Sequence, residues 1–269
     1  NDLEVLGEIN YSLNKQHYKK SVLEKLVDDL KTVYKIDKNA EEKDTLEEDE
    51  MNKMTSKEKL RYYLKNFPLK DMRFMFFIFI LIPVQTLFAH NWLTLPQYTS
   101  RAFDGFVGDN FEFFVNLNPI LIFVLTPIVT ALTLSKGTYK MMIIGTFIMA
   151  LTTFLITLGP NFYTLMAYLI LMTVGEAMWQ PRFLQWVAEI APKGMTGIYM
   201  GIGQFPWFLT KVITAIYSGW FLQNYCPDDT PMVDLNTESM WFIYGLIAII
   251  SPIGLILARK WMIKGFKES

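Results

Sequence analysis

The stretch that decides the fold is residues 74–95, FMFFIFILIPVQTLFAHNWLTL, which holds no Asp, Glu, Lys or Arg. A helix needs roughly 20 predominantly apolar residues to cross the hydrocarbon core of a bilayer. Five further stretches meet or approach that length: 115–134, 141–158, 162–190, 198–222 and 239–261. None alternates apolar and polar residues with a period of two, as a membrane barrel strand does. We therefore predict an all-α membrane protein with six transmembrane helices.

The charged residues are unevenly divided along the chain. Of 269 residues, 52% are hydrophobic and 19% are charged, with a net charge of −1. Residues 1–70 hold 29 of the 51 charged side chains, 14 basic and 15 acidic, which leaves 22 for the rest. This division excludes one soluble domain and a basic nucleic-acid binder, and the single cysteine, Cys226, excludes an internal disulfide. We predict a charged cytoplasmic segment at 1–70 and a six-helix transmembrane domain at 71–269.

The first segment carries two helical patterns. Residues 20–36 place apolar side chains at helical spacing, and the acidic run at 41–50 is typical of a solvated linker. A second helix is predicted to begin at Thr55, because Glu58 completes the spacing of a capping box. We expect this segment to lie on the membrane surface or on neighbouring loops. The alternative is that it docks a separate partner protein.

Basic residues predict the orientation of the spans. Lys and Arg collect on the cytoplasmic side of short membrane loops. One side of the six predicted spans receives only Arg101. The other side receives ten basic residues: Lys65, Lys70, Arg73, Lys136, Lys140, Lys193, Arg259, Lys260, Lys264 and Lys267. Both ends of the chain are therefore expected in the cytoplasm, or in the equivalent compartment of an organelle.

Polar content distinguishes the predicted spans from one another. The third and sixth are almost free of ionisable residues, whereas the first, fourth and fifth carry several. Charged groups inside a bilayer are costly unless they face protein or water. We expect the first, fourth and fifth spans to line an interior, with the second as a neighbour. The third and sixth are expected to form an outer layer that faces lipid. Six prolines, at 83, 119, 127, 181, 206 and 252, predict bends in the helices.

The fourth span carries the most informative residues, within GEAMWQPRFLQWVAEIAP at 175–192. Glu176 lies 14 residues from each end of the span, which places it near the bilayer midplane. A carboxylate at that depth is typical of a proton carrier, a cation partner or a binding group for an ammonium. The alternative is a buried ion pair with Lys211 or Arg182 that only supports helix packing. Arg182 and Glu189, nearer the cytoplasmic end, are candidates for a structural or gating charge pair.

Chemistry other than transport finds little support in the sequence. We find no metal-ligand cluster, no nucleophile beside a base, and no phosphate-binding or nucleotide-binding loop. An enzyme is therefore not expected, and neither is a metal or another cofactor. The side chains expected to shape a substrate site around Glu176 are Gln180, Asn118, Trp179 and Trp207.

Several motifs together resemble the proton-coupled oligopeptide transporters of the major facilitator superfamily. The residues that carry the resemblance are Gly175-Glu176, Pro181, Ala191-Pro192, Met200-Gly201, Asn118-Pro119, Thr126-Pro127 and Lys140. The resemblance covers about residues 72–262 and aligns the six spans with helices seven to twelve of that family. It implies the C-terminal half of a twelve-helix transporter, with residues 1–70 as the linker between the halves.

The resemblance also implies roles and partners. Glu176 would hold the amino terminus of a peptide or similar solute, and Asn118 would lie in the cavity. The expected function is proton-coupled symport by alternating access, which needs a second six-helix half from the same gene or a separate chain. The alternative is a half-transporter that carries no solute and serves as an accessory subunit of a larger membrane complex.

Overall fold

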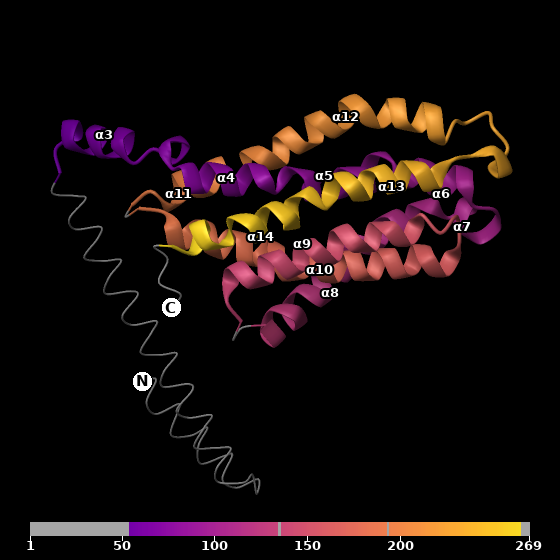
Figure 1. Ribbon diagram of the computed structural model, residues 1–269, viewed down its shortest axis with the longest axis horizontal. Coiled ribbons are helices and arrows are strands. Elements are labelled where there is room, and N and C mark those ends of the chain that lie inside the picture. Colours follow the sequence, from indigo (N-terminus) through magenta and orange to yellow (C-terminus); the bar gives the residue numbers. More distant parts are fainter. Residues whose placement is uncertain (1–53, 134–135, 193, 265–269) are drawn as a thin grey trace, which may run out of the picture. The chain divides into compact units, whose positions relative to one another are not determined.

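The computed structural model describes residues 54–133, 136–192 and 194–264, and every regular element in those ranges is a helix (Figure 1). The chain divides into two compact units, Asn1–Leu64 and Lys65–Ser269, which we describe separately. The predicted helix at 20–36 and the acidic run at 41–50 lie outside the described residues. The described part of the chain is thus all-helical, as the sequence predicts.

Helix α3 (Ser56–Lys65) begins where the sequence predicts a helix start. The backbone N–H and the hydroxyl of Thr55 both donate to the Glu58 carboxylate, at 2.8 and 2.7 Å. These two bonds lower the pKa of Glu58, because they favour its charged form. No residue of α3 is buried, and its apolar side chains Leu60 and Leu64 are exposed. Whether this segment lies on the membrane surface or docks a partner protein stays a prediction.

Five helical segments of the second unit are long and apolar enough to cross a membrane. Each falls within a few residues of a predicted span, so the chain is a multi-pass membrane protein. The five are Met72–Leu93, made of α4 (Met72–Ile80) and α5 (Ile82–Leu93); α8 (Phe111–Thr133); α9 (Thr138–Ile156); α10 (Phe162–Ile190); and Thr237–Ile263, made of α13 (Thr237–Ala248) and α14 (Ile250–Ile263).

The span predicted at 198–222 falls on two helices, α11 (Thr196–Gly203) and α12 (Phe205–Tyr225), which meet at Gln204. Neither is among the five candidate spans of the described residues, so the sixth crossing stays a prediction. Short elements complete the unit: η1 (Pro68–Lys70), α6 (Leu95–Ala102), α7 (Gly105–Asp109) and η2 (Met232–Asp234).

Only some of the predicted proline bends are helix breaks. Pro83 and Pro206 lie in the first turn of α5 and of α12, directly after the breaks at Leu81 and Gln204. Proline suits that position, since the first N–H groups of a helix have no intrahelical partner. Pro119 and Pro127 lie inside the continuous α8, and Pro181 lies inside the continuous α10.

A hydrogen bond connects the two broken spans of the unit. The first span is interrupted at Leu81 and the last at Ile249, close to Pro252. The Val84 N–H, directly after the proline of the first break, donates to the Ser251 hydroxyl at 2.9 Å. A backbone donor freed by a break in a membrane helix needs such a partner. Ser251 therefore satisfies the backbone of a neighbouring helix.

Two glycines set the closest approach of two helices, α9 and α10. A Cβ added to Gly145 would lie 2.6 Å from the Gly175 carbonyl oxygen, and one added to Gly175 would lie 2.7 Å from that of Gly145. Small residues allow membrane helices to pack backbone against backbone. Because Gly175 precedes Glu176, this contact also holds the carboxylate-bearing turn of α10 in place.

The expectation of a lipid-facing third span is wrong. About 56% of α9 is buried inside the unit, compared with 11% of α8, which was expected to be a neighbour of the interior. The physical reason is that the glycine contact seats α9 closely against α10, while α9 also packs against α13 and α14. In Figure 1, α8 and α12 lie at opposite edges of the second unit. Absence of charge thus did not distinguish a helix packed against protein from one exposed to lipid.

A polar clasp joins the loops at one end of the helices. Arg101 of α6 donates from Nη1 to the Cys226 carbonyl at 2.7 Å, and its Nε lies 3.2 Å from the Asp228 carboxylate. The Cys226 side chain is buried, and burial raises the pKa of its thiol to about 11. This clasp gives a structural role to the one basic residue predicted on that side.

Candidate functional site

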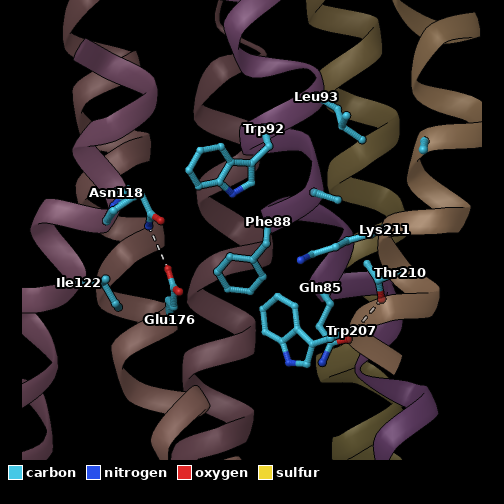
Figure 2. Close-up of a pocket in the computed structure, with 13 residues that line it drawn as sticks. Gln85, Phe88, Trp92, Leu93, Asn118, Ile122, Glu176, Trp207, Thr210 and Lys211 are labelled. Carbon is cyan, nitrogen blue, oxygen red and sulfur yellow. Dashed lines mark hydrogen bonds between the residues drawn. The ribbon is translucent and has the colours of Figure 1, made fainter. Parts of the chain in front are cut away.

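A cavity of about 650 Å³ opens between four helices, α5, α8, α10 and α12 (Figure 2). Ligand sites are commonly concave, mostly apolar and of this size. The lining residues are Gln85, Phe88, Ala89, Trp92 and Leu93 of α5; Asn118, Pro119 and Ile122 of α8; Glu176 of α10; and Trp207, Thr210, Lys211 and Ala215 of α12. These helices correspond to the first, second, fourth and fifth predicted spans.

Glu176 lies at the middle of α10 and is 6% exposed. Its carboxylate accepts a hydrogen bond from the Asn118 side-chain amide at 2.9 Å, and the same amide lies 2.9 Å from the Thr173 hydroxyl. Thr173 and Glu176 share one face of α10, and Asn118 reaches them from α8. Two of the sequence-predicted site residues, Glu176 and Asn118, are thus brought into direct contact.

The partner of Glu176 is neutral. Neither Lys211 nor Arg182 forms an ion pair with it, so the packing ion pair considered from the sequence is absent among the described residues. A carboxylate without a counter-charge is costly at the depth of a bilayer. A proton or a cationic group that enters the cavity would remove that cost. The arrangement can therefore bind either one.

The opposite wall carries a second polar group, from α5 and α12. The Thr210 hydroxyl donates to the Gln85 side-chain oxygen at 3.3 Å. The Gln85 side-chain nitrogen has no hydrogen-bond partner in the described part of the chain, although the residue is only 1% exposed. The Lys211 ammonium points into the cavity (Figure 2) and forms no ion pair with any described acidic residue. Two donor groups on this wall, the Gln85 amide nitrogen and the Lys211 ammonium, have no partner within the described ranges and could bind an acceptor group of a ligand.

Aromatic rings form part of the cavity wall. Trp207 lines the cavity and lies 5.0 Å, centre to centre, from the ring of Phe88. Behind it, Trp179 stacks nearly parallel at 6.5 Å and donates from its indole to the Met149 sulfur at 2.9 Å. Trp179 is fully buried and supports Trp207 without lining the cavity. Gln180 is half-buried and is not among the lining residues either.

The predicted charge pair is a chain of hydrogen bonds and not a direct contact. Arg182 donates to Gln185 at 2.8 Å, and Gln185 donates to Glu189 at 2.7 Å. The other guanidinium nitrogen donates to the Thr133 carbonyl at the end of α8, at 2.7 Å. Arg182 therefore ties the end of α8 to α10, away from the cavity.

One conspicuous residue outside the cavity is His90, which is fully buried. Its ring nitrogens lie 2.8 Å from the Thr94 hydroxyl and 2.9 Å from the Tyr217 hydroxyl, and its ring stacks on Tyr244 at 3.7 Å. With both nitrogens paired, His90 has a structural place. Among the described residues, no group of three or more His, Cys, Asp or Glu side chains could hold a metal ion.

The sequence predicts that the first span lines the interior, but it does not say which face of that span does so. Five residues of α5 line the cavity at the spacing of one helical face: Gln85, Phe88, Ala89, Trp92 and Leu93. Positions i, i+3, i+4, i+7 and i+8 share a face of any helix, and the one polar member of the set marks the face that avoids lipid. That signal was available in the sequence.

Comparisons with known proteins add no relative to this geometry. No protein-family model, curated protein or solved structure matches the chain.

Proposed function

We propose that this chain is one half of a proton-coupled secondary transporter of small peptides or similar amino-containing solutes. The observation that supports it most is Glu176, a buried carboxylate at the middle of a membrane helix that faces a cavity and, among the described residues, is bonded only to the neutral Asn118. Such a group can exchange a proton for the ammonium of a solute. Binding of the solute ammonium at this carboxylate would therefore depend on whether Glu176 carries a proton.

The exposed faces of α8 and α12 support a second half. Large apolar side chains such as Phe123 of α8, 83% exposed, and Ile216 of α12, 77% exposed, point away from the unit. The two helices also line the cavity, so a second bundle against them would close it. That arrangement matches alternating access between two six-helix halves around a central site. We include α12 as the sixth crossing, since its 21 residues reach about 30 Å.

The resemblance to the oligopeptide transporters names the solute class. It assigns the ammonium of the solute to Glu176, and the distribution of basic residues places both chain ends on the cytoplasmic side. Of the other predicted site residues, Trp207 would shape the cavity with Trp179 behind it, whereas Gln180 does not line it. In this proposal Arg182 and Glu189 hold the end of α8 against α10.

The test is uptake of labelled dialanine (L-alanyl-L-alanine) into proteoliposomes that contain the product of the complete gene. Glu176→Gln should lower proton-driven uptake about tenfold or more, since a lost charge-assisted bond costs about 1.5–3 kcal/mol. Glu112→Gln, a change at an exposed carboxylate near the start of α8, is the matched control. Unchanged uptake in Glu176→Gln would overturn the proposal. Absence of uptake by the well-folded wild type would favour the accessory-subunit alternative.

A further inference from the structure

We propose that Gln85 and Lys211 form a second binding subsite, for a carboxylate group, on the wall opposite Glu176. The inference rests on the proposed function and specifies its solute: a molecule with an ammonium at one end and a carboxylate at the other. It places the carboxylate site on α5 and α12, within this same six-helix unit.

The Gln85 side-chain amide has a buried donor that no group in the described ranges uses. Its oxygen accepts from the Thr210 hydroxyl at 3.3 Å, which orients the amide and leaves the nitrogen without a partner among the residues that the structure describes. Gln85 is 1% exposed and lines the cavity. A buried polar group without a partner is costly and calls for an explanation. An acceptor oxygen of a bound solute would supply the missing partner.

The Lys211 ammonium lies on the same wall of the cavity as Gln85. Lys211 follows Thr210 directly on α12, lines the cavity, and directs its ammonium toward the same space as Gln85 (Figure 2). It forms no ion pair with any described acidic residue. An ammonium and an amide N–H on the same wall of a cavity suit a carboxylate, whose two oxygens accept several charge-assisted hydrogen bonds.

The negative and the positive group stand on opposite walls of the cavity. Figure 2 shows Glu176 with Asn118 on one side, Lys211 with Gln85 on the other, and the apolar rings of Phe88 and Trp92 between them. The charges in the cavity are therefore one negative and one positive, held apart by side chains that bond to neither. A zwitterion would neutralise both walls, whereas an amine alone would leave Lys211 without a counter-charge.

The experiment is isothermal calorimetry of the purified protein in lipid nanodiscs, which does not depend on transport. The probes are dialanine, its C-terminal amide, which lacks the carboxylate, and N-acetyl-dialanine, which lacks the ammonium. We expect dialanine to bind more tightly than the amide by on the order of tenfold. Lys211→Met and Gln85→Leu should each weaken dialanine binding and leave binding of the amide unchanged.

Two control variants complete the design. Lys211→Arg should retain the preference for dialanine over its amide, and Lys260→Met, which removes an exposed lysine of α14, should bind like the wild type. Equal binding of dialanine and its amide by the wild type would overturn the subsite, as would absence of binding by any probe. A preference that persists in both Lys211→Met and Gln85→Leu would place the carboxylate elsewhere and overturn it too.

The same probes separate this inference from the proposed function. Loss of the preference for dialanine over N-acetyl-dialanine in Glu176→Gln reports on the ammonium wall alone. If the carboxylate preference is present in nanodiscs and uptake is absent in proteoliposomes, the subsite stands and the transport proposal fails. If uptake depends on Glu176 but the amide binds as well as dialanine, transport stands and the subsite fails.

Discussion

The two neighbours of α10 differ in how they are attached to it. Helix α9 is seated backbone against backbone at Gly145 and Gly175, and about 56% of it is buried. Helix α8 is 11% buried and is joined to α10 by hydrogen bonds from Asn118 to Glu176 and from Arg182 to Thr133. Both helices are long and apolar, so composition alone does not separate them.

The difference separates a helix surface that is permanently packed inside the unit from one that stays open to lipid or to another protein surface. A contact between small residues gains dispersion energy only while the helices stay together, so it suits a fixed interface. A few polar bonds position a helix and leave its apolar face open to lipid or to another bundle. The candidate site lies beside helices of the second kind, α8 and α12, together with α5 and α10.

The largest expected effect comes from filling the glycine contact. Gly175→Leu would drive a side chain into the backbone of α9, and we expect a loss of about 3 kcal/mol or more, or failure to fold. Gly219→Leu is the matched control, because a Cβ at that position of α12 meets nothing within 4 Å. Thermal melting of the detergent-solubilised protein compares them. Equal melting temperatures would show that the α9–α10 contact is not tighter than the α12 flank.

The next expected effect compares the stability lost on removing Arg182 with that lost on removing Lys211. Arg182→Ala would remove the donor of the Thr133 carbonyl and of Gln185, so we expect a loss of about 1–3 kcal/mol in the free energy of unfolding. Lys211→Ala breaks no ion pair among the described residues and should change stability by less than about 0.5 kcal/mol. Unfolding in mixed detergent and SDS micelles measures both. A larger loss in Lys211→Ala would contradict its assignment to the cavity.

The smallest expected effect tests whether any protein surface covers the exposed face of α8. Met142→Ala would leave a hole in the fully buried face of α9 and should cost about 1–2 kcal/mol, the cavity part of such a truncation. Leu132→Ala removes a side chain of α8 that is 75% exposed, and we expect less than about 0.5 kcal/mol in the same unfolding assay. If Leu132→Ala costs as much as Met142→Ala, another protein surface covers α8.

Much of the architecture was predictable because a bilayer imposes a length on apolar helices. Five predicted spans have their counterparts in the structure, and the Thr55–Glu58 contact was predicted from spacing alone. The helix break at Gln204 was not predicted as a break, only as a bend at Pro206. Local steric rules indicate where a helix can bend, but packing against neighbours decides whether the hydrogen-bond ladder is interrupted.

The candidate site was predictable in part. Glu176 is recognisable from its depth in the longest span, because a carboxylate in hydrocarbon is expensive wherever the helix packs. Its bond to Asn118, the unpaired nitrogen of Gln85, and the place of Trp179 behind Trp207 depend on which faces of four helices meet. Those faces are far apart in the chain, so no local pattern reports their contact.

By itself, the sequence determined the helical class, the positions of five membrane-spanning segments and the single carboxylate at mid-span. Those features follow from composition and spacing, which act through the lipid and through helix geometry regardless of what lies beside each helix. Only the tertiary structure decided that α9 is packed and α8 is open, and that the carboxylate faces an ammonium across a cavity. The physical reason is that helix packing depends on the shapes of two surfaces at once, here the two glycines that let α9 reach the backbone of α10.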